Sequence, residues 1–530
     1  MLFLRRTPTP IPLLFSVLKF VSGFVLASAA YELHRDEYLY LEQGRHLAWG
    51  YLEVPPLIAV QAWLTHLLGG GYFWVKFWPF LWGALTVYVV GRAAARLGAG
   101  WFGQALACVV YIVSGYSRLN FLFQPNSLEV FGFTLTCYLL LRFIQQPQPK
   151  WWYYIGACLG LSLLNKYTTF FFIAALGVGL LLTEQRRVFT HKHFWGGVAV
   201  ALLLFLPSAL WQLTHGVPFL QHMRKLEESQ LVNVSLADFW KDQLLMCFPA
   251  LWVWVPGLLA LLLYRPFRPY RSLGFLWLAG LLILTVLHGK SYYALGYYPI
   301  LFAFGAAWLE QQLSRWRIAP FLKPMLLALP VLVILPLAPF FFTLYPPAYM
   351  EEFSKRHADL GITRWEDGQL HPLPQDYADM VGWQEMADKT YAVYQSLPDS
   401  TRARTLILCA NYGQASAVNY FNRHRNIPHA ASMNGSFLFW FPPRQSFQNI
   451  IIVDDEPDSL AAHFSSYRRR AEVLNPYARE KGTRITLGTR PDKAILDTVY
   501  AEHRRELASW TGSSANNEFT EAEIRIPSEL

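Results

Sequence analysis

Two adjacent acids, Asp36 and Glu37, follow the first long apolar run of this 530-residue chain. They lie near the start of the segment HRDEYLYLEQGRHLAWGYLEVPPL, residues 34–57. A charged side chain beside membrane hydrocarbon costs about 2.5–3.5 kcal/mol, so acids at the end of a membrane span are seldom there for packing alone. Carboxylates in this position predict proton transfer or ion binding, although the same two acids could simply cap a helix at the membrane surface.

The composition predicts where these acids work. The chain is 54% hydrophobic and 16% aromatic but only 15% charged, which is more apolar than a soluble protein of this size. We therefore expect a polytopic membrane protein. The net charge of +9 does not indicate nucleic-acid binding, because the early lysines and arginines lie in short segments between apolar runs, as membrane orientation requires. The five cysteines fit neither a metal site nor a disulfide framework.

Eleven apolar stretches could each cross a bilayer as a helix. The first follows Arg5 and Arg6 without a clear cleavage site and is expected to remain as an anchor. Two short spans share a tight turn at Asn165, Lys166 and Tyr167, so the parity of the count depends on that pair. The predicted spans are residues 11–31, 72–91, 101–117, 127–144, 151–165, 168–183, 194–212, 246–264, 272–288, 294–310 and 324–344.

The charges of the loops predict the orientation of the chain. With the N-terminus in the cytoplasm, every inside loop is basic, as the positive-inside rule requires. These inside residues are Arg5, Arg6, Arg92, Arg96, Arg142, Lys150, Arg186, Arg187, Lys192, Arg265, Arg268, Arg271, Arg315, Arg317 and Lys323. The opposite loops hold acids, namely Glu32, Asp36, Glu37, Glu42, Glu53, Glu227, Glu228 and Asp242. The first acidic loop is therefore expected to face the periplasm or an equivalent outer compartment.

The composition becomes that of an ordinary globular protein after about residue 345. The stretch 405–421 predicts a buried strand, a turn and a helix, and 449–457 predicts another strand. The predicted organisation is a transmembrane domain over residues 1–344, a small extracytoplasmic α/β domain over 345–510 and a mobile tail over 511–530. No phosphate-binding glycine loop or nucleophile elbow occurs in the globular part.

Four segments of the chain resemble a known group of membrane enzymes. They are DEYLYLEQGRHLAWGYLEVPPL after the first span, RLNFLFQPNSLE (118–129), GLSLLNKYTTFF (160–171) and HGKSYYALGYYP (288–299). All four fall on outer loops of the predicted topology. Over residues 11–310 the chain resembles the membrane glycosyltransferases of the C-type fold (GT-C). The resemblance is to the group that contains the dolichyl-phosphate-mannose protein mannosyltransferases, the aminoarabinose transferases of lipid A and the lipopolysaccharide core galacturonosyltransferases.

This resemblance implies transfer of a hexose or pentose from a polyprenyl-phosphate carrier to a hydroxyl on the outer face of the membrane. The acceptor could be a glycan, a lipid or a protein, and the sequence names neither it nor the sugar. By position Asp36 takes the role of the base for the acceptor, or helps to hold a divalent cation such as Mg²⁺ or Mn²⁺, with Glu37 as its neighbour. A hydroxyl that attacks an anomeric carbon needs a carboxylate within hydrogen-bond reach, which agrees with that role.

The leaving lipid phosphate would need cations or hydrogen-bond donors in a shielded site. Arg118, Lys166 and Lys290 are the cations that stand beside spans on the outer loops, and Tyr292 and Tyr293 add two phenol donors. These five residues are the predicted phosphate contacts. The alternative is that the cations only extend to the lipid headgroups and that the phenols belong to an interfacial belt.

One departure from the relatives concerns the second outer loop. Where several relatives carry a second carboxylate, this chain has Gln124 and Asn126, with Glu129 slightly further on. The difference argues against a metal site shared by two acids. Glu53 stands before the Pro55-Pro56 pair, where some relatives carry another polar or basic residue. We therefore predict Glu53, Gln124, Asn126 and Glu129 as contacts of the acceptor or of the sugar.

The main alternative function is a transporter or flippase of a lipid-linked or polar substrate. Such proteins place polar groups near the middle of the membrane and usually contain paired repeats. Here the ionisable residues gather at the outer ends of the spans, and no internal repeat is visible. A catalytically inactive scaffold is a third reading. The expected location is the inner (plasma) membrane, among its lipids, with the active site and the C-terminal domain on the periplasmic or extracellular side.

Overall fold

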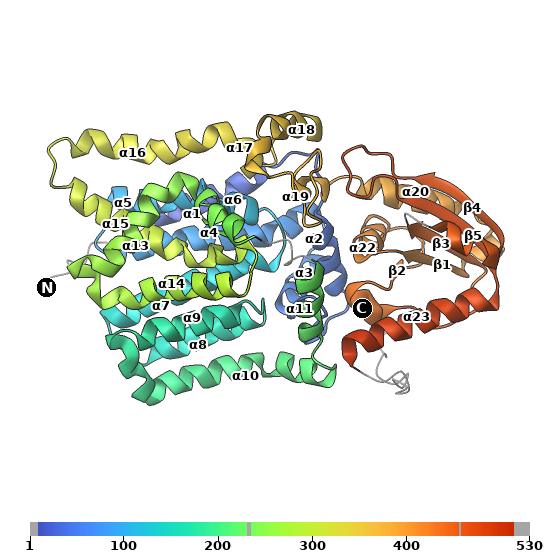
Figure 1. Ribbon diagram of the computed structural model, residues 1–530, viewed down its shortest axis with the longest axis horizontal. Helices are drawn as coiled ribbons and strands as arrows, with labels where there is room; N and C mark the ends of the chain where they lie inside the picture. The colour runs from blue at the N-terminus through green and yellow to red at the C-terminus, as the bar shows by residue number, and fades with distance from the viewer. Residues whose placement is uncertain (1–8, 230–234, 455–456, 513–530) are drawn as a thin grey trace.

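The computed structural model describes residues 9–229, 235–454 and 457–512. Its first two thirds form a bundle of helices, and the last third contains a β-sheet (Figure 1). The helices of the bundle are α1 (Ile11–Val25), α4 (Tyr72–Arg96), α5 (Trp101–Ile112), α6 (Tyr116–Leu119), α7 (Pro125–Gln145), α8 (Lys150–Leu163), α9 (Thr169–Leu181), α10 (Lys192–Thr214), α13 (Leu251–Leu263), α14 (Arg271–Val286), α15 (Pro299–Leu313), α16 (Ala319–Ile334) and α17 (Ala338–Phe341).

The number of membrane spans differs from the predicted eleven. By length and composition, five helical segments of the described residues can cross a membrane, or seven if two sharply bent pairs each count as one span. Each of the eleven predicted spans overlaps a helix, but several of these helices are short. Helices α8 and α9, for example, contain 14 and 13 residues, whereas a perpendicular span needs about 20. The protein is thus a mostly helical, multi-pass structure, and the count of eleven stays a prediction.

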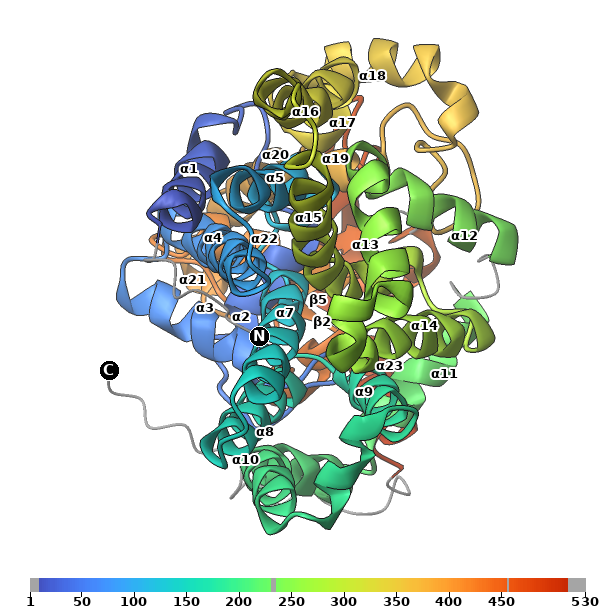
Figure 2. The same cartoon turned by 90° about the vertical axis from the view of Figure 1, so that its left-hand side faces the viewer.

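Two helices at opposite edges of the bundle expose apolar surface. In α10 and in the segment Ala319–Phe341, only 11% and 17% of the most apolar window is buried, and the two lie at opposite edges in both views (Figures 1 and 2). Inside the bundle, glycines allow close helix contact. A Cβ on Gly156 of α8 would lie 2.0 Å from the carbonyl oxygen of Gly197 in α10. Small residues at such contacts are typical of helices that pack within a membrane.

Three amphipathic or short helices lie between the bundle and the sheet (Figure 1). They are α2 (Arg35–Gln43), α3 (Leu57–Leu67) and α11 (Pro218–Ser229), and α12 (Leu236–Leu245) follows α11 in the chain. Helix α3 begins directly after Pro55 and Pro56, where proline fits a first helical turn. Helix α2 begins with a capping box. The side chain of its N-cap, His34, accepts from the Asp36 amide, and Glu37 accepts from the His34 amide.

The C-terminal part contains a mixed five-stranded sheet in the order β2-β1-β3-β5-β4. Its centre is parallel, with Ile407 of β1 opposite Ile451 of β3, and β5 then pairs antiparallel with both β3 and β4. The strands are β1 (Thr405–Cys409), β2 (Ala431–Ser432), β3 (Asn449–Asp454), β4 (Phe464–Glu472) and β5 (Arg484–Pro491). The accompanying helices are α18 (Pro347–Arg356), α19 (Gln375–Ala378), α20 (Trp383–Gln395), α21 (Asp399–Arg402), α22 (Tyr412–Phe421) and α23 (Lys493–Thr511).

The strand, turn and helix predicted at 405–421 correspond to β1 and α22, and the predicted strand at 449–457 corresponds to β3. Most of the predicted mobile tail, from residue 513 onward, lies outside the described residues. A hydrophobic core joins the C-terminal part to the bundle side. Tyr38 and Leu41 of α2 belong to the same buried cluster as Trp383 and Ile451, so the helix that carries Asp36 is packed against the sheet domain.

Candidate active site

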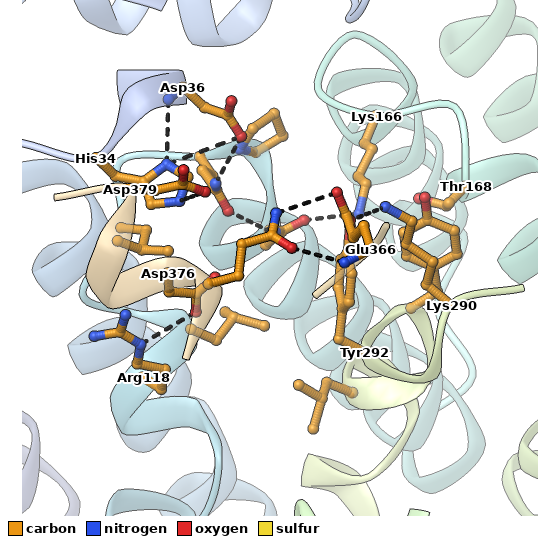
Figure 3. A pocket seen from close by; sticks show the side chains of 18 of the residues that line it. His34, Asp36, Arg118, Lys166, Thr168, Lys290, Tyr292, Glu366, Asp376 and Asp379 are labelled. Atoms are coloured by element: carbon orange, nitrogen blue, oxygen red, sulfur yellow. Dashed lines mark hydrogen bonds and ion pairs between the residues drawn. The ribbon is translucent and has the colours of Figure 1, made fainter. Parts of the chain in front are cut away.

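A cavity of about 1220 Å³ lies where the loops of the bundle meet the C-terminal part. Figure 3 shows its polar wall, with His34, Asp36 and Asp379 on one side and Lys166, Lys290 and Glu366 on the other. The remaining lining is largely apolar and includes Leu119, Leu122, Phe170, Phe171, Phe219, Met223, Leu226, Phe340 and Phe341. The cavity therefore combines a charged centre with surfaces that suit hydrocarbon.

Asp36 stands in the first turn of α2 and lines this cavity. Its Oδ1 accepts a hydrogen bond from the Tyr412 hydroxyl at 2.8 Å, and its Oδ2 accepts one from the Gln124 amide nitrogen at 3.1 Å. Arg35 Nε lies 3.8 Å from Oδ1. The side chain of Asp36 remains 28% exposed, so a substrate hydroxyl can approach the carboxylate from the cavity.

The surroundings of Asp36 favour its ionised form. Burial alone would raise the pKa of this carboxyl, but His34, Arg35 and the hydroxyl of Tyr412 outweigh burial and hold the pKa below its ordinary value. Asp36 is therefore an anion at neutral pH. An ionised carboxylate is the protonation state that a general base requires.

A continuous chain of hydrogen bonds links Asp36 to the opposite cation. Gln124 donates to Asp36, and its Oε1 accepts from Asn126 Nδ2 at 2.9 Å. Asn126 Oδ1 in turn accepts from Lys166 Nζ at 2.7 Å, and Lys166 also pairs with Glu129 Oε2 at 3.0 Å. Glu129 is buried behind Lys166 and does not line the cavity. The structure thus brings residues of three predicted outer loops into one network.

The second cation, Lys290, faces the same part of the cavity (Figure 3). Its Nζ lies 2.5 Å from Oε1 of Glu366, a residue of the C-terminal part. Lys166 Nζ lies 4.5 and 5.3 Å from the ring centroids of Tyr293 and Tyr292. Burial lowers the pKa of Lys166, although Glu129 opposes this effect, and burial raises the pKa of Tyr293 to about 12. Both phenols line the cavity, and with pKa values raised by burial they stay neutral hydrogen-bond donors.

The structure does not bring Glu37 into this cavity. Its side chain is fully buried and pairs with Lys76 Nζ at 2.7 Å. Its two oxygens also accept from the backbone amides of Phe123 at 2.6 Å and His34 at 2.7 Å. Adjacent residues of a helix point about 100° apart, so Asp36 can face the cavity while Glu37 faces the protein interior. With no open side toward substrate, Glu37 cannot serve as the alternative base.

Arg118 lines a different wall of the cavity from the two lysines (Figure 3). Its Nε pairs with Asp376 Oδ2 at 3.2 Å, and its guanidinium lies 4.2 Å from the Tyr377 ring centroid. The other two guanidinium nitrogens are buried and have no hydrogen-bond partner among the residues that the structure describes. Arg118 thus stands apart from Lys166 and Lys290 in Figure 3, and its contact with a donor phosphate stays a prediction.

Glu53 lines the cavity but is held by the C-terminal part. Its Oε1 accepts from the backbone amide of Ser436 at 2.7 Å, and its Oε2 accepts from the Ser436 hydroxyl at 2.5 Å and from Gln43 at 3.1 Å. Burial raises the pKa of Glu53, and the bonds from Ser436 oppose the rise. These contacts fix the loop before Pro55 against the sheet domain.

The donors around Asp36 do not fit the predicted divalent cation. Both of its oxygens accept hydrogen bonds, and the guanidinium of Arg35 stands beside them. A divalent metal instead prefers several oxygen ligands without a competing cation. Across the described ranges, no group of three or more His, Cys, Asp or Glu side chains could hold a metal ion.

The sequence interpretation did not find the residues that the C-terminal part adds to the cavity. Tyr412, Asp379 and Glu366 all line it, and His34 Nε2 lies 3.5 Å from Asp379 Oδ2. Their signal in the sequence is weak, because an Asp, a Glu or a Tyr in a globular segment is common. His34 and Arg35 were visible in the HRDE segment, where their position beside Asp36 was the available clue.

Parts of the chain are similar in sequence to known glycosyltransferases. Residues 53–211 match the family described as dolichyl-phosphate-mannose-protein mannosyltransferase. The lipid A galacturonosyltransferase RgtD of Rhizobium johnstonii is 24% identical over 209 residues, which are 38% of this chain and 43% of RgtD. The chain therefore spans less than half the length of this curated relative in the match.

Comparison with solved structures supports the fold. ArnT from Cupriavidus metallidurans bound to undecaprenyl phosphate superposes with a TM-score of 0.58 and 16% identity, over 90% of this chain and 97% of that one. The apo state of the same protein gives a TM-score of 0.55 over the same shares of the two chains. Together the family match, the curated relative and the shared fold confirm the resemblance to the GT-C membrane glycosyltransferases that the loop motifs predicted.

Proposed function

We propose that this protein transfers a sugar from a polyprenyl-phosphate donor to a hydroxyl acceptor on the outer face of the membrane. One observation carries the proposal: the Asp36 carboxylate and the Lys166 ammonium line one cavity and are linked through Gln124 and Asn126. Transfer of a sugar from a lipid phosphate to a hydroxyl needs a base for the hydroxyl and a cation for the phosphate, and the network holds one at each end.

In the proposed mechanism the ionised Asp36 accepts the proton of the acceptor hydroxyl. The hydroxyl oxygen attacks the anomeric carbon as the bond from that carbon to the donor phosphate breaks, and the bonding electrons leave with the phosphate. Negative charge grows on the phosphate in the transition state, where fixed cations stabilise it most. Lys166 and Lys290 supply the positive charge that stabilises the phosphate, and Tyr292 and Tyr293 can donate hydrogen bonds from the same wall.

The apolar lining supports a lipid-linked donor. Phe170 and Phe171 of α9, together with Phe219, Met223 and Leu226 of α11, line the cavity that holds the lysines. Burial of a lipid chain against such side chains stabilises the complex by about 25 cal/mol for each Å² of apolar surface removed from water. The solved structure with the same fold carries undecaprenyl phosphate, which agrees with a polyprenyl phosphate as the donor carrier of this chain.

The loop charges support the orientation of the site. The basic loops predicted to be cytoplasmic join α4 to α5, α7 to α8, α9 to α10, α13 to α14 and α15 to α16, whereas the cavity is built from the other set of loops. By the positive-inside rule we place the cavity and the sheet domain on the periplasmic or extracellular side of the plasma membrane. The proposed division is a transmembrane domain over 1–344 and an outer α/β domain over 345–510. A transporter is less well supported, because the described cavity lies at one end of the bundle.

The test is a comparison of a deletion strain with its parent. Loss of the enzyme should make one polyprenyl-phosphate sugar accumulate and remove one sugar from a surface glycan, lipid or protein. Purified protein should then release polyprenyl phosphate from that carrier only when the acceptor is present. An unchanged set of lipid-linked sugars, together with no transfer in the purified system, would reject the proposed reaction.

A further inference from the structure

The hydroxyl of Tyr412 reaches Asp36 from a segment 376 residues further along the chain. Tyr412 is the first residue of α22, the helix that follows strand β1, and it lines the cavity. Its hydroxyl oxygen lies 2.8 Å from Asp36 Oδ1 and 3.1 Å from Arg35 Nε, and it also contacts a terminal nitrogen of Arg35. The guanidinium carbon of Arg35 lies 4.6 Å from the centroid of the Tyr412 ring.

These contacts fix the direction of the hydrogen bond between Tyr412 and Asp36. An arginine side chain has only donors, so the phenol oxygen accepts both bonds from Arg35. An ionised carboxylate has only acceptors, so the single proton of the phenol must be donated to Asp36. The hydroxyl therefore stabilises the ionised form of Asp36 more than the neutral form, because a carboxylate oxygen is the stronger acceptor and protonation at Oδ1 would leave two donors facing one another.

The sheet domain holds Tyr412 rigidly in this place. Asn411 caps α22 by accepting from the amide of Gln414 at 3.1 Å, and Gln414 in turn donates to Glu480 at 2.6 Å. Gly413 lets the start of α22 approach α2, since a Cβ at that position would lie 2.4 Å from Cγ of Arg35. The hydroxyl is thus positioned by a packed helix start and not by a free loop.

We propose that Tyr412 is a positioning residue for the transfer: it aims the Asp36 carboxylate at the acceptor hydroxyl and keeps it ionised. The inference rests on the proposed function of Asp36 as the base. It gives the C-terminal part a role in positioning the base. The bundle holds only Oδ2 of Asp36, through Gln124, whereas the C-terminal part holds Oδ1, through Tyr412. Arg35 supports the arrangement by orienting the phenol.

Loss of the Tyr412 hydroxyl should shift the pH dependence of the transfer rate in one direction. The groups that face Asp36 or its immediate partners are His34, Arg35 and Tyr40 on the α2 side, Gln124, Lys290, Glu53, Asp379 and Tyr412. Tyr412→Phe removes one donor to the charged carboxylate and leaves the other groups in place. A lost hydrogen bond to the charged form raises a carboxyl pKa, so the acidic limb of the transfer rate should move to higher pH.

The experiment compares Tyr412→Phe with Tyr420→Phe in purified, full-length protein. Tyr420 lies on the same helix and also bridges the two parts of the protein, since its hydroxyl lies 3.3 Å from the Gly70 carbonyl oxygen. It does not contact Asp36. Tyr412→Phe should lower kcat about tenfold with little change in the KM for the donor, and should move the acidic limb upward by about one pH unit. Tyr420→Phe should keep the wild-type profile.

The outcomes separate this inference from the proposed function. A wild-type rate and pH profile in Tyr412→Phe would overturn the positioning role while leaving the transferase intact. Equal losses in both variants without a pH shift would mean that Tyr412 only joins the two parts of the protein, and would also overturn it. If the wild-type protein shows no transfer, the proposed function itself fails. Thermal unfolding of each variant is measured as well, to confirm that all variants are equally folded.

Discussion

The carboxylate of Glu37 forms a fully buried ion pair with Lys76 of α4, with 2.7 Å between Lys76 Nζ and Glu37 Oε1. The same carboxylate accepts from the amides of Phe123 and His34. It therefore ties the start of α2 to the loop that carries Gln124, and so sets the distance between Asp36 and the first member of its hydrogen-bond network. Glu37 supports the site from inside the protein and does not face substrate.

Breaking this pair should destabilise the protein. Removal of one partner of a buried ion pair leaves an uncompensated charge and costs about 3–5 kcal/mol. Glu37→Gln and Lys76→Met should each lower the thermal unfolding midpoint in detergent, and the double variant should lose less than the sum of the two, because the residues are coupled. Glu352→Gln, at an exposed ion pair with Lys355, is the control. Wild-type stability with lost transfer in Glu37→Gln would contradict the structural role.

The exposed neighbour, Asp36, should behave in the opposite way. Asp36→Asn keeps the size of the side chain but removes the charge that accepts a proton, so transfer should fall by about 100-fold or more. Membrane levels should stay close to those of the wild type, and thermal stability should fall less than in Glu37→Gln, since the lowered pKa of Asp36 shows that its charge contributes some stability. Asp388→Asn, which changes a carboxylate paired with Arg425 near the surface, controls for the loss of one negative charge. Near-normal turnover in Asp36→Asn would exclude Asp36 as the base.

The contrast between these adjacent acids shows how far the sequence could predict the site. Hydropathy and loop charge placed Asp36, Gln124, Asn126, Lys166 and Lys290 on loops at the same end of the predicted bundle, and the structure gathers them around one cavity. Their proximity follows from topology, since alternate loops of a helical bundle meet at the same end. The orientation of Glu37 depends on the residue at which α2 begins and on its pairing with the buried Lys76. A hydropathy pattern predicts neither of these.

The contributions of the C-terminal part could not be predicted for a different reason. Tyr412 contacts Asp36 and Glu366 contacts Lys290 across long stretches of chain. A strand and a helix at 405–421 were predictable from local pattern, but the docking of α22 on α2 depends on a shared core of residues such as Tyr38 and Trp383. No local sequence pattern identifies Tyr412 or Glu366 as part of the site, because their place depends on how the C-terminal part packs against the bundle.

The two lysines of the cavity should affect donor binding and turnover together. A shielded charge-assisted contact with a phosphate is worth about 1.5–3 kcal/mol, and it strengthens as the leaving phosphate gains charge. Lys166→Met and Lys290→Met should therefore raise the KM for the polyprenyl-phosphate sugar and lower kcat. Lys355→Met, on the exposed face of α18, is the control. Wild-type curves of rate against donor concentration in both variants would reject the phosphate site and leave Asp36 as the base.

The carboxylate of Glu366 lies beside Lys290, which is the proposed contact of the donor phosphate. Lys290 Nζ lies 2.5 Å from Glu366 Oε1, and the side chain of Glu366 is 45% exposed. Gln375 holds the same residue by accepting from its backbone amide at 2.9 Å and donating to its Oε2 at 3.3 Å. A phosphate that binds Lys290 must therefore displace this carboxylate or share the ammonium with it.

We expect Glu366→Gln to tighten donor binding. The amide keeps the shape of the side chain but no longer competes as an anion for Lys290, so the KM for the polyprenyl-phosphate sugar should fall severalfold while kcat changes little. Inorganic phosphate should also inhibit Glu366→Gln more strongly than it inhibits the wild type, because the carboxylate of Glu366 no longer competes with phosphate for Lys290. The charge-matched control is Glu352→Gln on α18. A higher KM in Glu366→Gln would mean that the carboxylate orients Lys290 for the donor, and competition at this lysine would then be rejected.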